Sequence, residues 1–391
     1  MMMTINQAMT NTSIIGIGRT SVTEAWGTSI RHLAWYAIEE ALDNAATTAI
    51  DAIYVGNMLA GTASNQRNLA ALVADFSGMR GIEAMLVDAG EASGAAAVRQ
   101  ATMAVASGMI QTALVVGVEK ASDTTGAEFD GILATSLDAE YEQIHGMTPT
   151  AQAALVMQRY MYEHGVEVSD FANFSVNAHA NGGKNPQAMF RNRWKAERFG
   201  RAPQVATPVS LFDAAPAGDG AAAVIVTRTD RAADMVPQPV QIAGSAMATD
   251  TLAVHDRRDL LWLRSAEIST RHAMQQAKVT TNNIDLFELH DSYTIAAALA
   301  LEATGFANRG EGYLMAKQNE IGLNGRLPIS TFGGLKARGN PLGATGVYQI
   351  VEVCQQLRGT AGDNQVAHAQ IGMTQNLGGF GTTAVTHILK I

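Results

Sequence analysis

The sequence predicts an α/β protein in which helices cover both faces of a parallel sheet. Short β-rich apolar runs are continuous rather than alternating, which is typical of strands buried on both faces. Longer Ala-rich stretches separate these runs, as expected for helices between strands. The pattern then repeats after the segment "DMVPQPV", so we expect two similar halves. The runs lie at 13–18, 52–57, 85–90, 112–119 and 221–226, and then at 240–247, 284–290, 366–374 and 382–391.

A helix rich in small residues occurs in each half. Residues 90–108 and 339–359 both begin with Gly and small side chains and continue with apolar or small residues. Because Gly and Ala let helices approach closely, we expect both helices to lie in the core.

Between the halves lies a region of different character, residues 120–220, which holds many charged and amide side chains. The stretch 175–201 contains the basic residues Lys184, Arg191 and Arg193. Long excursions of this kind are often binding or lid elements, and the alternative is a solvated surface insertion. The expected division is an N-terminal half (1–119 with 221–235), the inserted region (120–220) and a C-terminal half (236–391).

Composition narrows the functional classes. Of the 391 residues, 47% are hydrophobic and only 16% are charged, which favours extensive buried or subunit-facing surface and an oligomer. The net charge of -9 and the lack of basic clusters argue against nucleic-acid binding. The single cysteine, Cys354, excludes an internal disulfide framework and Cys-based zinc motifs. With neither a secretory signal nor an apolar run of about 20 residues, a soluble cytoplasmic protein is expected, without membrane contact.

Several long motifs, in order along nearly the whole chain, resemble the thiolase superfamily, especially its archaeal and sterol-carrier-protein-x type members. They are "VDAGEASG", "VGVEKASD", "HGMTPTAQAALVMQRYM", "LFDAAPAGDGAAAVIV", "HDSYTIAAALALEATGF", "GGLKARGNPLGATGVYQIVEVCQQLRG" and "TQNLGGFGTTAVTHIL". The resemblance implies the thiolase fold: two βαβαβαββ halves in five layers, αβαβα, with a loop domain inserted in the first half. It also implies a homodimer or higher oligomer, coenzyme A or acyl-CoA as substrate or ligand, and a small zinc-ribbon/OB-fold partner protein.

The chain departs from the family pattern at three points. Glu91 stands where the family has its nucleophilic cysteine, and Asn340 replaces the histidine that activates it. The family's His-Asp-Cys-Phe motif is here His290, Asp291, Ser292 and Tyr293, so its acid/base cysteine is absent. Acyl transfer through an enzyme thioester needs a thiolate and a base to form it. Cysteine-dependent thiolysis is therefore not expected.

The remaining groups predict acid/base chemistry. His290 and Asn340 can donate hydrogen bonds to an enolate oxygen. Glu91, at a helix start, can act as general base or acid, with Ser292 or Tyr293 as a proton relay. Such a set suits aldol, retro-aldol or decarboxylative chemistry on an acyl-CoA. The alternative readings are structural: Glu91 caps a helix or pairs with a cation, Tyr293 packs, and Asn340 braces its loop.

Three functions therefore stay open. The first is acid/base catalysis at a carbon–carbon bond next to a thioester, without an acyl-cysteine. The second is a non-catalytic, pseudoenzyme-like subunit of an acyl-CoA complex, and the third is a persisting acetyl-CoA acyltransferase activity. No metal and no resident cofactor are expected. The coenzyme A side of the site is predicted to involve Lys184, Arg191, Arg193, Gly343 and Ala344.

Overall fold

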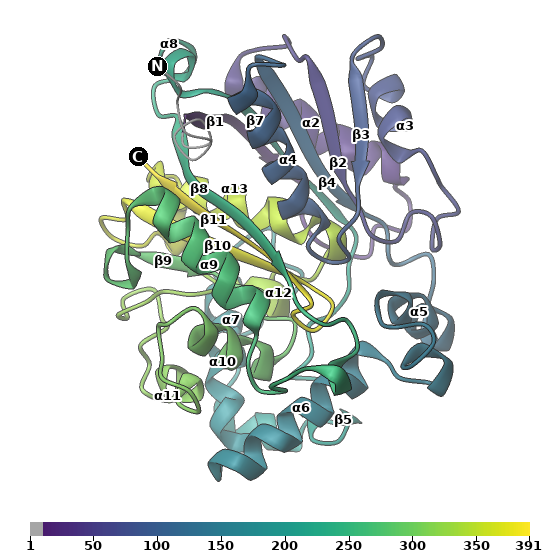
Figure 1. Ribbon diagram of the computed structural model, residues 1–391, viewed down its shortest axis with the longest axis vertical. Coiled ribbons are helices and arrows are strands. Elements are labelled where there is room, and N and C mark those ends of the chain that lie inside the picture. The colour runs from purple at the N-terminus through teal and green to yellow at the C-terminus, as the bar shows by residue number, and fades with distance from the viewer. Residues whose placement is uncertain (1–10) are drawn as a thin grey trace.

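The computed structural model describes residues 11–391, and within them the chain forms two halves with the same order of elements (Figure 1). The expectation concerning residues 1–10, that no signal sequence begins the chain, lies outside the described residues. The first half comprises β1 (Thr12–Arg19), α2 (Ile30–Ala45), β2 (Ala52–Gly56), α3 (Leu69–Phe76), β3 (Glu83–Val87), α4 (Ser93–Ser107), β4 (Thr112–Glu119), β7 (Gly220–Arg228) and α8 (Thr229–Met235). The second comprises β8 (Val240–Thr249), α9 (Arg264–Ala277), β9 (Leu286–Glu288), α10 (Thr294–Ala303), α11 (Gly312–Lys317), α12 (Gly334–Ala337), α13 (Thr345–Leu357), β10 (Ile371–Gly378) and β11 (Thr383–Lys390).

The sheet shows the duplication directly. Its strand order is β3-β2-β4-β7-β1 in the first half and continues as β8-β11-β10-β9 in the second. Each half thus places its first strand at the junction, where β1 and β8 meet through only three residue pairs. The counterpart of β3 is a single bridge between Phe287 of β9 and Ile329. The two halves therefore share one topology, although the second has lost most of its outermost strand.

The strand directions correct one sequence expectation. The sheet is mixed: β2 runs parallel to β3 and β4, and β9 runs parallel to β10, whereas the other pairings are antiparallel. Continuous hydrophobicity reports burial on both faces and carries no information on direction. The expected run 366–374 is also shifted, because β10 begins only at Ile371 and continues to Gly378.

The layers follow from which helices share a core with which strands. Helices α2 and α3 pack on one face of the first-half strands, and α4 and α13 pack on the other. Helix α9 covers the outer face of the second half. The result is the αβαβα order, with α4 and α13 in the central layer. A Cβ at Gly346 of α13 would lie 2.4 Å from the Ala95 nitrogen of α4, so the close approach of the two central helices requires glycine there.

The inserted region packs mainly on the second half. It contains α5 (Gly126–Leu133), α6 (Pro149–His164), α7 (Ala172–Gly182), and the short strands β5 (Gln204–Ala206) and β6 (Val209–Ser210). Apolar side chains of α6 and of the segment before α7 belong to the same core as α10. Figure 1 shows α6 and α7 next to the elements of the second half. The polar excursion expected from composition therefore has a buried apolar underside.

Strand β3 differs from the other long strands because it is exposed. It forms one edge of the sheet and pairs only with β2. Met85 and Leu86, which point to opposite faces, are both about 40% exposed. Strand β3 therefore departs from the expectation that the strands are buried on both faces. Among the described residues, no helix is long and apolar enough to cross a membrane.

Candidate active site

The first component of the site is the turn between β3 and α4, which carries Glu91. Gly90 adopts a left-handed conformation (φ 62°) that lets the chain reverse just before the helix. The hydroxyl of Ser93, the first residue of α4, accepts from the Ala89 nitrogen at 2.9 Å and donates to the Gly90 carbonyl. Ser93 is thus a structural hydroxyl. These hydrogen bonds within the turn fix its backbone. The Glu91 side chain remains 19% exposed.

Asn340 faces Glu91 from the other half of the molecule. Its Oδ1 accepts from the Leu342 nitrogen and from the Thr345 hydroxyl, each at 3.0 Å. These two donors fix the orientation of the amide, so its Nδ2 points outward and donates to Glu91 Oε1 at 3.1 Å. Asn340 is therefore a held hydrogen-bond donor, and its backbone also joins the segment 216–218.

His290 approaches the other oxygen of the same carboxylate. It is 1% exposed, and its Nε2 lies 3.4 Å from Glu91 Oε2. On the opposite side of the ring, Asn376 Nδ2 lies 2.9 Å from His290 Nδ1. With the amide in this orientation Nδ1 accepts, so the ring proton resides on Nε2 and faces Glu91. That nitrogen has no hydrogen-bond partner among the described residues, which leaves a buried donor next to the cavity.

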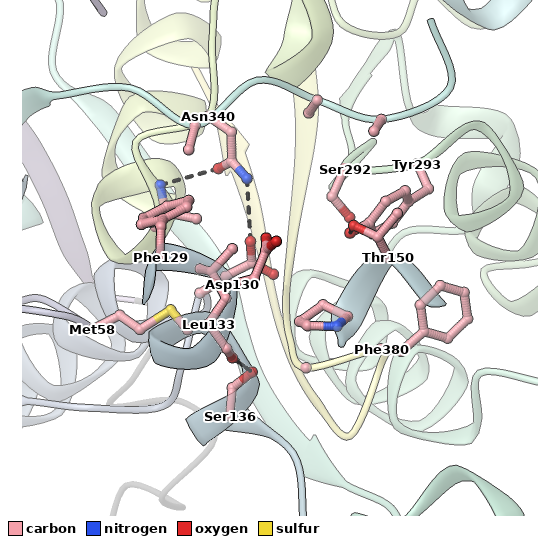
Figure 2. A pocket seen from close by; sticks show the side chains of 17 residues that line it. Met58, Phe129, Asp130, Leu133, Ser136, Thr150, Ser292, Tyr293, Asn340 and Phe380 are labelled. Atoms are coloured by element: carbon pink, nitrogen blue, oxygen red, sulfur yellow. Dashed lines mark hydrogen bonds between the residues drawn. The ribbon is translucent and has the colours of Figure 1, made fainter. Parts of the chain in front are cut away.

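These groups meet at a cavity of about 180 Å³ between the halves and the inserted region (Figure 2). Glu91, Ser292, Tyr293 and Asn340 all line it, and His290 lines a smaller pocket that shares Ser292 with it. The structure thus brings together the five residues proposed from sequence for catalysis. The remaining wall is largely apolar and includes Met58, Phe129, Leu133, Pro149, Ala214, Ala215, Leu342 and Phe380.

Tyr293 lines the cavity as a buried, protonated phenol. Its hydroxyl lies 2.9 Å from that of Thr150 on α6. Burial raises the pKa of Tyr293 well above its usual value, and the carboxylates of Glu91 and Asp130 act in the same direction. The phenol therefore stays protonated at neutral pH, where it can donate a hydrogen bond but is a weak acid. Ser292 contributes a hydroxyl to the wall, while its carbonyl accepts from the Ala215 nitrogen.

The chain's only cysteine is remote from this chemistry. Cys354 lies in α13 with no exposed surface and belongs to the core between the two central helices. Burial raises the pKa of its thiol to about 12. The thiolate, which is the nucleophilic form, is therefore essentially absent at neutral pH.

A larger cleft of about 460 Å³ adjoins the first cavity. The two share Ala214 and Ala215. Aromatic side chains dominate the cleft, and the rings of Trp194 and Phe212 stack at 4.2 Å. Its wall also carries three cationic side chains, from Arg193, Arg198 and Lys336. The cleft therefore places an aromatic surface and positive charge next to the site, with Ala214 and Ala215 at the border of the two.

The predicted coenzyme A residues are distributed unevenly around this cleft. Arg193 lines it, whereas Lys184 and Arg191 do not. Gly343 and Ala344 are buried and line neither cavity, because they pack against the start of α4 and against β4. The Gly343 nitrogen donates to the buried carboxylate of Glu119 at 3.1 Å. Both residues therefore shape the backbone beneath the site. Among residues 11–391, no cluster of His, Cys, Asp and Glu side chains could hold a metal ion.

Sequence reasoning missed four residues of the two cavities and their supports. Asn376 and Thr345 lie within recognised motifs, yet the contacts that orient His290 and Asn340 depend on the fold. Trp194 was part of a segment read only for its basic side chains, although an aromatic residue among cations is itself a signal for a ligand surface. Asp130, on α5, carries no motif.

Comparisons with known proteins agree with the fold and the duplicated halves. A family model described as "Thiolase, N-terminal domain" matches residues 11–194, and one described as "Thiolase C-terminal domain-like" matches residues 246–391. The chain belongs to the thiolase superfamily.

Particular relatives have different activities. The chain is 40% identical to an acetyl-CoA acetyltransferase of Methanothermobacter thermautotrophicus, covering 98% of this chain and all of that protein. It is 29% identical to the benzoylsuccinyl-CoA thiolase subunit BbsB of Thauera aromatica, over 85% of each chain. A solved structure described as "Ltp2-ChsH2(DUF35) aldolase" superimposes with a TM-score of 0.85 at 24% identity, covering 97% of both chains. Human mitochondrial 3-ketoacyl-CoA thiolase in complex with CoA superimposes at 0.76 with 16% identity, over 98% of both chains.

Proposed function

We propose that this protein makes or breaks a carbon–carbon bond next to the thioester of an acyl-CoA by acid/base catalysis, without an acyl-cysteine intermediate. The observation that carries the proposal is the Glu91 carboxylate at the wall of the cavity, which accepts from Asn340 Nδ2 and lies 3.4 Å from His290 Nε2. A carboxylate next to two donors can exchange a proton with a substrate whose developing negative charge those donors then stabilise.

A retro-aldol reaction illustrates how the groups would act. Glu91 takes the proton of a β-hydroxyl group, and the Cα–Cβ bond breaks to leave a carbonyl product. The electron pair of that bond moves to the α-carbon and thioester oxygen as an enolate. His290 and Asn340 donate to this oxygen once Glu91, now neutral, releases them. Glu91 then returns the proton to the α-carbon, which completes the acyl-CoA product and restores the carboxylate. The aldol reaction is the reverse sequence.

The neighbouring cleft supports an acyl-CoA as the ligand. Aromatic rings and cations suit a purine and phosphate groups, and the cleft borders the cavity at Ala214 and Ala215. The thiolase described in complex with CoA shares this fold, and the acetyltransferase relative is named for a CoA thioester. In this arrangement the acyl group occupies the cavity at Glu91, and the nucleotide end lies near Arg193, Arg198 and Trp194.

The acetyltransferase named for the Methanothermobacter relative is the less favoured function. Cysteine-dependent transfer needs a reactive thiolate, and the only cysteine is buried in the core with its pKa raised to about 12. A solved structure with the same fold is described as an aldolase, which supports the proposed reaction over acyl transfer.

The test compares two reactions on one preparation. Purified protein would be given 3-hydroxyacyl-CoA substrates, with release of free aldehyde or ketone measured by chromatography, and separately acetoacetyl-CoA with CoA for thiolysis. We expect carbonyl release and no thiolysis. Thiolysis without carbonyl release would overturn the proposal.

A second candidate is a non-catalytic subunit that binds acyl-CoA within a larger assembly. This candidate requires an assembly, and the exposed edge strand β3, where Met85 and Leu86 leave both faces uncovered, offers a surface for one. Unpaired, apolar sheet edges are seldom left open in a stable monomer. We infer that β3 pairs with a second copy of the chain.

The name BbsB "subunit" and the description Ltp2-ChsH2(DUF35) also point to assemblies among similar proteins, in line with a small OB-fold partner here.

Analytical ultracentrifugation of the wild type and of Leu86→Glu tests whether the chain pairs with a second copy through β3. We expect a dimer that dissociates in the variant. A wild-type monomer would refute pairing through β3. Acyl-CoA binding without turnover, measured both alone and with an OB-fold partner, would favour the non-catalytic candidate.

A further inference from the structure

A second carboxylate faces the cavity across from the catalytic groups. Asp130, on α5, lines the cavity together with Glu91, and Figure 2 shows it opposite Ser292 and Tyr293. Both carboxylates act on the same phenol, because each raises the pKa of Tyr293 in addition to the effect of burial. Asp130 makes no salt bridge among the described residues, so its charge is not neutralised by a neighbouring cation.

The cavity has no positive charge to balance these acids. Its 17 lining residues include neither lysine nor arginine. The cations of the neighbouring region lie in the aromatic cleft instead, beyond Ala214 and Ala215. The two ends of the proposed binding site therefore have opposite electrostatic character: cationic where a nucleotide would lie, and anionic where the acyl group would lie.

The size of the cavity limits the acyl group. At about 180 Å³ it slightly exceeds the ~150 Å³ cavity that accommodates benzene in an engineered protein. Phe129, Leu133 and Phe380 give much of the wall an apolar surface. An unpartnered donor, His290 Nε2, lies next to this space and is only 1% exposed. The space therefore suits a short acyl chain whose oxygens are uncharged acceptors.

We propose that Asp130 is a specificity residue that selects short, neutral acyl groups and rejects acyl groups ending in a carboxylate. This inference rests on the proposed acyl-CoA function and names its substrate class. A terminal carboxylate in the cavity would be repelled by Asp130 and Glu91. Two like charges about 12 Å apart at an effective dielectric of about 20 repel by ~1.4 kcal/mol, which is about tenfold in binding, and a closer approach costs more. The same repulsion disfavours binding of a malonyl-type substrate, and therefore decarboxylation as the route to the enolate.

Isothermal titration calorimetry with butyryl-CoA and succinyl-CoA tests the proposal, because the two share a four-carbon acyl chain and differ in the terminal carboxylate. We expect the wild type to bind butyryl-CoA about tenfold more tightly. Asp130→Asn should narrow that ratio at least threefold, and Asp130→Lys should abolish or reverse it. Glu128→Gln is the matched control, since it removes one charge from the same helix at a side chain that does not line the cavity. Its ratio should equal that of the wild type.

The outcomes distinguish this inference from the proposed function. Equal affinities in the wild type, or a ratio unchanged in both Asp130 variants, would overturn the selection by Asp130 while acyl-CoA binding stands. A ratio that narrows equally in Glu128→Gln would overturn it too, because the effect would then come from net charge. Binding of neither ligand by the wild type would overturn the proposed function and this inference with it.

Discussion

The turns that enter the two central helices occupy equivalent places in the two halves, and they carry different chemistry. Before α4, Gly90 (φ 62°) precedes Glu91; before α13, Gly339 (φ 105°) precedes Asn340. Each glycine reverses the chain so that the next side chain points toward the junction of the halves. The two side chains meet there, with Asn340 Nδ2 donating to Glu91 Oε1 at 3.1 Å.

The difference lies in how each side chain is held. Local donors from Leu342 and Thr345 occupy the Asn340 carbonyl, which leaves its amide one fixed role. Among the described residues, Glu91 accepts from Asn340 and lies 3.4 Å from His290 Nε2, and both groups are at the cavity, so a ligand can compete for these donors. The duplicated fold thus supplies a rigid donor from one half and an exchangeable proton acceptor from the other.

Removing the exchangeable acceptor should have the largest effect. Glu91→Gln keeps the shape and can still accept from Asn340, but it cannot take up a proton. We expect carbonyl release from a 3-hydroxyacyl-CoA to fall about 10³-fold in kcat, measured alongside circular dichroism and thermal unfolding as checks on folding. Activity within tenfold of the wild type would show that Glu91 is not the base.

Removing the rigid donor should cost less. Asn340→Ala deletes one enolate donor, and we expect kcat to fall about 10²-fold with a smaller change in KM. Thr345→Val, which deletes only the hydroxyl that holds the Asn340 carbonyl, should give a weaker loss in the same direction. An effect confined to KM in both variants would assign Asn340 to ground-state binding.

Replacing Glu91 by the cysteine that the family has at this position should not create thiolase activity. Glu91→Cys supplies a thiol, but Asn340 cannot deprotonate it and His290 presents a proton toward it rather than a free nitrogen. Thiolysis of acetoacetyl-CoA should stay at background in the single variant. Rapid thiolysis would mean that another group at this junction acts as the base.

The smallest expected effect is that of a thiol reagent. With its pKa raised from 9.0 to about 12, the Cys354 thiol has a thiolate fraction at pH 8 about 10³-fold below that of a free thiol. Iodoacetamide should therefore leave activity intact, and mass spectrometry should find Cys354 unlabelled until the protein unfolds. Inactivation that parallels labelling of Cys354 would place the thiol in the chemistry.

The sequence predicts the fold and the central residues well, since both depend on local patterns. Apolar runs, small-residue helices and long motifs indicate the two halves and the meeting of Glu91, His290 and Asn340. It does not predict features set by tertiary contacts. The antiparallel return strands are indistinguishable from parallel ones when both faces are buried. Asp130 gives no periodic or motif signal, and the orientations imposed by Asn376 and Thr345 emerge only once distant segments pack together.

Hydrogen exchange at the α-carbon of a simple acyl-CoA tests the central claim most directly, because it isolates enolate formation and needs no knowledge of the carbonyl partner. Butyryl-CoA would be incubated with protein in D₂O and its deuterium content followed by mass spectrometry. Acid/base catalysis by Glu91 predicts deuterium at the α-carbon with the wild type and background exchange with Glu91→Gln, although both bind the ligand. Background exchange with a wild type that binds butyryl-CoA, or equal exchange in the variant, would contradict it.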